Sequence, residues 1–207
     1  MPQAEAHEVS EVEQNMAILR NAAPTVAASM NKTIRAVRVA HDVPVPPVAK
    51  KIHFIRHGEG HHNVAQREWR ANPAWNGMSE PYTIDNDPTH RYVDAELTAK
   101  GEAEARALQE ITEPALKPEV MIVSPMRRAT LTGLLAFEPH IKRGELPVVA
   151  NELCHERGGR HTCDKRLAKS TLQQQYPNID YTLVAEEEDP FWLDGWTREP
   201  WTEVCQR

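Results

Sequence analysis

The chain has 207 residues, of which 40% are hydrophobic and 26% charged, and its formal net charge is −6. This length and composition predict one globular domain with a hydrophobic core, together with a tail. The negative net charge disfavours non-specific nucleic-acid binding, although a local basic pocket can still hold an anionic substrate.

Residues 1–50 differ from the rest of the chain in composition. An acidic, Ala-rich stretch precedes a predicted helix over 12–22, and three prolines between positions 44 and 47 then favour an extended segment. We therefore predict a flexible N-terminal extension with a Pro-rich linker over 1–50. The predicted domain occupies residues 51–207.

The stretch that follows the linker organises the rest of the chain. Residues 52–55 mix apolar and β-favouring residues over the length of a strand, and Gly58 and Gly60 then allow a sharp turn. Arg56 and His57 therefore stand between a predicted strand and a loop that leads to a helix. In open α/β sheets ligands bind at this edge, and a cation beside an imidazole near a helix start suits a phosphate.

The remaining elements alternate between helices and strands. Residues 64–93 are predicted to form a long irregular insertion. Its aromatic residues either shape the substrate site or pack locally against the domain, and the sequence leaves both roles open. A helix over 99–111 follows, with Thr98 as its N-cap. The later predictions are a buried strand over 120–123, a helix that starts in 124–132, a strand over 147–150, a loop over 151–165 and a helix over 166–176. This alternation predicts an α/β domain.

Several segments, in the right order, resemble the histidine phosphatase superfamily, the phosphoglycerate-mutase-like proteins. The matching motifs are R-H-G-E over 56–59 with His62-Asn63, L-T-x-x-G over 97–101, S-x-x-x-R-A-x-x-T over 124–132, and the stretches 158–166, 176–181 and 186–192. The last three stretches resemble the plant and microbial phosphoglycerate-mutase-like branch. The resemblance implies a three-layer α/β/α sandwich with a mostly parallel sheet.

The resemblance also implies a two-step phosphoryl transfer. His57 is the expected nucleophile, which becomes phosphohistidine, and Glu156 is the expected acid that later accepts a proton from water. Arg56, Asn63 and Arg128 are expected to bind the phosphoryl oxygens, so that no metal or other cofactor is needed. The expected partner is a phosphorylated small molecule or a phosphoprotein. The expected reaction is phosphomonoester hydrolysis, with a phosphomutase of the phosphoglycerate-mutase type as an alternative.

One part of the family pattern is missing from this sequence. The family supplies a second histidine from a late strand, in a motif like T-H-G or T-H-S-G, and no such motif is found here. After Glu156 the sequence has a single histidine, His161, which lies in an H-x-C-D stretch. We therefore expect a C-terminally incomplete domain, and weak or absent activity for the chain as it stands.

Other functions stay open at this level. A domain that lacks one phosphate ligand can bind phosphorylated ligands or proteins without turnover. A zinc site is another alternative, although no C-x-x-C or H-E-x-x-H pattern supports it, and His61 and His62 are more simply a turn beside the pocket. Its candidate ligands are His61, His62, His155, His161 and Cys163.

Cysteine usage and hydropathy indicate the compartment. The three cysteines, Cys154, Cys163 and Cys205, form an odd and sparse set that predicts reduced thiols. No apolar run has the length of a membrane span, and the N-terminus lacks a secretory pattern. These features predict a cytoplasmic protein with no membrane or nucleic-acid partner.

Overall fold

The computed structural model describes residues 51–207, so the predictions for residues 1–50 lie outside the described part. The contacts of the chain divide it into two units, one of which comprises residues 55–199. Residues 51–54 and 200–207 belong to the other unit, in which α8 (Trp201–Val204) begins directly after Pro200.

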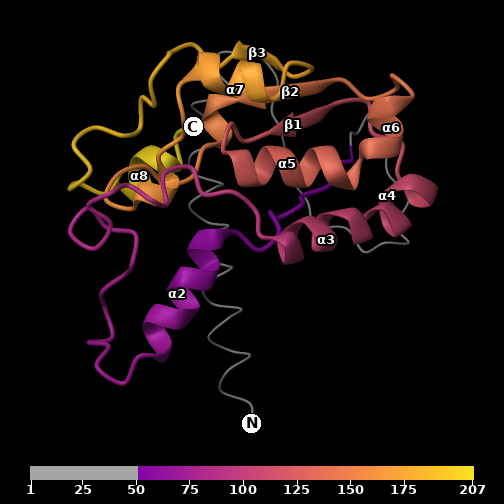
Figure 1. The fold of residues 1–207 in the computed structure, drawn as a ribbon. Helices are drawn as coiled ribbons and strands as arrows, with labels where there is room; N and C mark the ends of the chain where they lie inside the picture. Colours follow the sequence, from indigo (N-terminus) through magenta and orange to yellow (C-terminus); the bar gives the residue numbers. More distant parts are fainter. Residues whose placement is uncertain (1–50) are drawn as a thin grey trace. The chain divides into compact units, whose positions relative to one another are not determined.

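The 55–199 unit contains a three-stranded parallel sheet, drawn in the upper part of Figure 1. Its strands are β1 (Met121–Val123), β2 (Val148–Asn151) and β3 (Asp180–Leu183), in the order β1-β2-β3. Met121 lies opposite Val148, and Val123 lies opposite Ala150. Val123, Val148 and Ala150 are buried on one face, because side chains two residues apart on a strand point to the same side.

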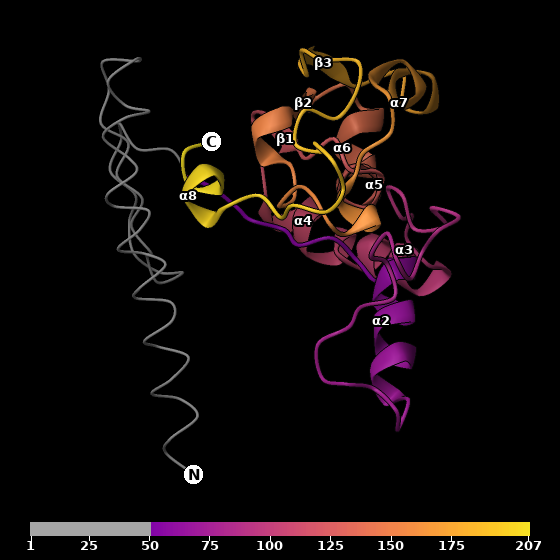
Figure 2. The ribbon, with the colours of Figure 1, turned by 90° about the vertical axis from the view of Figure 1, so that its left-hand side faces the viewer.

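Helices connect the parallel strands and cover that buried face. α5 (Arg127–Ala136) packs against β1, and α3 (Ala99–Ala107) packs against α5, as Figures 1 and 2 show. The other helices of this part are α4 (Gln109–Ala115), α6 (Glu138–Lys142) and α7 (Lys169–Gln175). Parallel strands need such crossovers, since no short turn can join them. The predicted α/β class with a parallel sheet is therefore confirmed.

α2 (His61–Ala71) projects away from the sheet, and an irregular segment follows it (Figures 1 and 2). Residues 64–71, predicted as part of an irregular insertion, are therefore helical. They contain no glycine or proline, and the helix ends just before Pro73, as expected for a residue that disfavours helix in front of it. Two short 3₁₀ turns, η1 (Glu152–Cys154) and η2 (Thr162–Asp164), interrupt the loop over 151–165.

Two other predictions need correction, and one strand was missed. Residues 52–55 form no strand, because nothing in the described chain pairs with them to complete the ladder of backbone hydrogen bonds. The predicted helix over 99–111 is divided at Leu108, whose N–H is shared between the carbonyls of Ala105 and Arg106. The strand β3 was not predicted, since its four residues lack a continuous apolar run.

Candidate active site

The loop that carries His57 is attached to α5. The backbone N–H of Gly58 donates to Oγ1 of Thr132 over 3.1 Å, and the same hydroxyl donates to the carbonyl of Arg128 over 2.7 Å. Thr132 and Arg128 are the threonine and arginine of the S-x-x-x-R-A-x-x-T segment. This threonine therefore links the expected nucleophile to the helix that presents the expected phosphate-binding arginine.

Two glycines bring the same loop close to α3. A Cβ added to Gly58 would lie 2.4 Å from the carbonyl oxygen of Gly101, and one added to Gly101 would lie 2.1 Å from that of Glu59. Neither separation is sterically possible between backbone atoms. Thr98 then fixes the loop, because its N–H and hydroxyl both donate to the Glu59 carbonyl, over 2.9 and 3.2 Å. The glycines of R-H-G and L-T-x-x-G thus serve one contact.

His57 is half-buried and is oriented by its own loop. Its Nδ1 lies 2.7 Å from the carbonyl of Gly58, which can only accept, so Nδ1 carries the proton and Nε2 keeps its lone pair. Burial lowers the pKa of His57 below 6.5; Arg128 and Arg56 add to this effect, while the bond to Gly58 and the charge of Glu156 oppose it. A neutral ring with a free Nε2 is the form that attacks phosphorus.

Arg128 is almost completely buried, and one edge of its guanidinium is occupied. One terminal nitrogen donates to the carbonyl of Cys163 over 2.6 Å, and the other donates to Asp164 Oδ1 over 3.0 Å. The second nitrogen also lies 3.9 Å from Oε1 of Glu156, whose side chain is 47% exposed. His57, Arg128 and Glu156, which are distant in sequence, are therefore neighbours in the structure.

Asp164 is the buried carboxylate that orients Arg128. Burial raises its pKa, but His161, Arg128 and Arg198 together hold this pKa well below its usual range. Its second oxygen accepts from Arg198 over 2.8 Å. Asp164 had no predicted role, although it belongs to the H-x-C-D stretch. The H-x-C-D motif was therefore the available signal, but the sequence did not show that its aspartate contacts Arg128.

The two other expected phosphate ligands occupy different environments. Arg56 is exposed, and its charge acts on the His57 ring. Asn63 stands in the first turn of α2, where Oδ1 accepts from the Gly60 N–H over 2.9 Å and the Asn63 N–H donates to the Gly60 carbonyl over 2.9 Å. The side-chain oxygen of Asn63 is therefore committed to the helix start, and its NH₂ group is the part that can donate to an anion.

Three curated proteins illustrate what the sequence is similar to. A probable phosphatase of Schizosaccharomyces pombe is 31% identical over 68% of this chain and 56% of its own length. Phosphoglycerate mutase-like protein 1 of Arabidopsis thaliana is 28% identical, over 69% and 55% respectively. A probable phosphoglycerate mutase of Arthroderma benhamiae is 30% identical, over 66% and 42%.

The chain belongs to the phosphoglycerate-mutase-like proteins of the histidine phosphatase superfamily. It spans about half the length of these three relatives, between 42% and 56%. No family model matches the chain.

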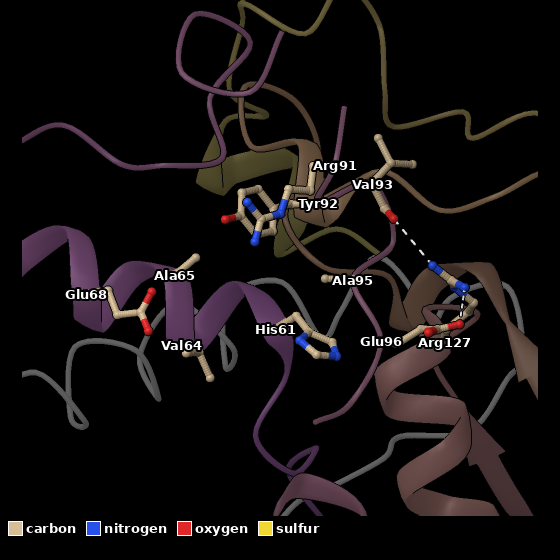
Figure 3. A pocket seen from close by; sticks show the side chains of 10 residues that line it. All are labelled: His61, Val64, Ala65, Glu68, Arg91, Tyr92, Val93, Ala95, Glu96 and Arg127. Carbon is tan, nitrogen blue, oxygen red and sulfur yellow. Dashed lines mark hydrogen bonds and ion pairs between the residues drawn. The ribbon is translucent and has the colours of Figure 1, made fainter. Parts of the chain in front are cut away.

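A cavity of about 310 Å³ lies between α2 and the start of α5 (Figure 3). Its Arg127 is fully engaged, since it forms an ion pair with Glu96 and donates to the carbonyls of Asp94 and Val93. His61 lines the cavity from the first turn of α2. The cavity is lined by His61, Val64, Ala65, Glu68, Arg91, Tyr92, Val93, Ala95, Glu96 and Arg127.

A buried ion pair supports the turn that carries Glu156. His155 Nδ1 donates to the Glu156 carbonyl over 2.6 Å, and its Nε2 donates to Asp189 Oδ2 over 3.0 Å. Burial lowers the pKa of His155, but the bond and charge of Asp189 outweigh this effect and raise it overall. Both ring nitrogens act as donors, so the His155 ring is positively charged and faces the carboxylate of Asp189. From the sequence, this histidine was a candidate only as a metal ligand.

Residues 51–207 hold no group of three histidine, cysteine, aspartate or glutamate side chains arranged to bind a metal ion. The three cysteines, which all lie in this part of the chain, form no disulfide with one another. Within the same part of the chain, no helix combines the length and apolar character that a membrane crossing requires.

Proposed function

We propose that this chain carries a phosphoryl-transfer site that hydrolyses phosphomonoesters through a phosphohistidine on His57. The observation that carries the proposal is the arrangement of His57 beside Arg128. The ring presents an unprotonated Nε2, and the Nε–H of the guanidinium is buried without a hydrogen-bond acceptor. A buried donor without an acceptor is uncommon, and a bound phosphoryl oxygen supplies one.

The first step transfers the phosphoryl group to the protein. Nε2 of His57 forms a bond to phosphorus while the bond between phosphorus and the ester oxygen breaks. The leaving oxygen takes its proton from the carboxyl group of Glu156. Nδ1 keeps its proton and its bond to Gly58, so the phosphorylated ring carries a positive charge that the phosphoryl group partly neutralises.

The second step restores the site. A water molecule attacks phosphorus and gives a proton to the Glu156 carboxylate. The bond between phosphorus and Nε2 breaks, inorganic phosphate leaves, and His57 is neutral again. Arg56, Arg128 and the NH₂ group of Asn63 balance the charge of the phosphoryl oxygens in both steps. A phosphomutase would differ only in the acceptor, a substrate hydroxyl in place of water.

A second function, binding without turnover, is favoured by one observation. Two of the three nitrogens of Arg128 already donate to Cys163 and Asp164, which leaves fewer donors for the transition state. In this case the partner is a phosphorylated small molecule or a phosphoprotein that the site retains.

The two functions are separated by one set of measurements on the purified chain. Hydrolysis of para-nitrophenyl phosphate and acid-labile phosphate on the protein are measured for the wild type and for His57→Ala. Labelling that depends on His57 supports the enzyme, and turnover is expected to fall at least ~1,000-fold in the variant. Inorganic phosphate binding without labelling supports the binding module. Neither binding nor labelling would overturn both.

A further inference from the structure

Two buried polar atoms lack a hydrogen-bond partner in residues 51–207, and both lie beside His57. They are Nε of Arg128 and Nδ1 of His62. Native proteins contain few such atoms, and each one needs an explanation. Arg128 is already part of the proposed site, whereas His62 was treated in sequence analysis as part of a turn.

His62 is positioned as tightly as the residues of the site. It is the second residue of α2 and is only 7% exposed. Its ring centroid lies 5.7 Å from that of His57 and 6.1 Å from that of Tyr82. Gly60 makes room for this ring, because a Cβ at that position would lie 2.7 Å from Nδ1 of His62.

The surroundings of His62 exclude a charged ring. Burial is the largest cause that lowers its pKa, and the charges of Arg128, His57 and Arg56 lower it further, against the opposing charge of Asp164. The resulting pKa is about 3. A neutral imidazole keeps one N–H donor and is not repelled by the nearby guanidinium groups. It can therefore donate to an anion in a site that already contains cations.

We propose that His62 is a further phosphoryl-binding residue, which donates one ring N–H to an oxygen of the phosphoryl group that His57 carries. This proposal rests on the proposed function. The alternative is that His62 has only a packing role between His57 and Tyr82. Because Phe keeps the ring and removes the nitrogens, His62→Phe separates the two explanations.

The test uses the full chain and inorganic phosphate as the probe. Nitrogen-15 spectra of the histidine rings are recorded with and without saturating phosphate, and phosphate affinity is measured by calorimetry. We expect the ring nitrogens of His62 to shift, and His62→Phe to weaken phosphate binding about tenfold. His61→Phe, at the adjacent exposed position, is the matched control and is expected to bind phosphate as the wild type does.

The outcomes distinguish the two proposals. If phosphate saturates the wild type but leaves the His62 nitrogens unshifted, or if His62→Phe binds phosphate equally well, His62 is a packing residue and the present proposal fails alone. If the wild type neither binds phosphate nor becomes labelled on His57, the proposed function fails with it. The spectra of the wild type decide the matter even if His62→Phe does not fold.

Discussion

The cavity of Figure 3 and the surroundings of His57 each contain one histidine and one arginine from the same two helices. α2 begins with His61 and His62, and α5 begins with Arg127 and Arg128. His61 and Arg127 line the cavity of Figure 3, where every described contact of Arg127 is with an oxygen of the protein. His62 and Arg128 are buried beside His57, and each keeps one nitrogen without a partner.

The two regions therefore differ in whether their polar side-chain atoms have hydrogen-bond partners within the protein, and not in residue type. Consecutive residues on a helix point about 100° apart, so one member of each pair enters the interior and the other does not. A cation whose donors are all bound to protein oxygens stabilises the fold. A buried cation with a donor left over is prepared for an anion that the fold does not contain.

The largest effect is expected from a comparison of the two arginines. Arg128→Lys should weaken phosphate binding and His57 labelling at least ~100-fold, because one ammonium nitrogen cannot take the separate positions of the three guanidinium nitrogens. Arg127→Lys should change both by less than about threefold, since its partners are protein groups. Equal losses in the two variants, measured by calorimetry and labelling, would break the distinction between the regions.

The carboxylate partners of the arginines give the next largest effect. Asp164→Asn leaves the buried Arg128 without its counter-charge and should lower the free energy of unfolding by about 3 kcal/mol. Glu96, the partner of Arg127, is 51% exposed, so Glu96→Gln should cost less than about 1 kcal/mol. Urea denaturation at neutral pH measures both, and a similar cost for the two would contradict the comparison.

A smaller effect is expected in the pH dependence of stability. The pKa of His62 is lowered from 6.5 to about 3 in the folded state. The unfolded chain therefore binds more protons between these values, and stability falls as the pH drops through this window. His62→Phe removes this dependence and should show a shallower loss of melting temperature between pH 7 and pH 4.5. An unchanged slope in circular-dichroism melts would show that the ring is accessible to protons.

The smallest effect is expected for the His155–Asp189 pair, whose contribution to stability depends on pH in the opposite direction to that of His62. The pKa of His155 is raised by Asp189, against the effect of burial, so the stability that this pair adds is present below pH 6.5 and is lost as the pH rises through the raised pKa. His155→Gln should thus lose more stability relative to wild type at pH 6 than at pH 9. Melts at the two pH values provide the measurement.

The sequence allowed a good prediction of those elements whose signal is local. The strands over 121–123 and 148–151 were predicted from short apolar runs, and Thr98 caps α3 as its position indicated, with its side chain accepting from Gly101 N. The strand predicted over 52–55 was wrong, because local β-propensity cannot supply a partner strand. β3 was missed for the opposite reason, since its neighbours in the sheet determine it and its own residues carry a weak signal.

The expected site residues illustrate the same limit. The motifs pointed to His57, Arg128 and Glu156, and the structure brings these three together. His62 could not be told from His61 in the sequence, because the rotation of α2 and the close approach of Gly60 decide which of the two is buried. The role of Asp164 depends on a contact across 36 residues of chain, which no local pattern reveals.

The bond from Gly58 to Thr132 has a mechanical consequence. One helix bonds the loop of the proposed nucleophile and carries the guanidinium beside it, so we expect a small shift of α5 to move both groups together. The spacing between the ring of His57 and the cation is then less sensitive to such a shift than it would be if the two were held by separate elements.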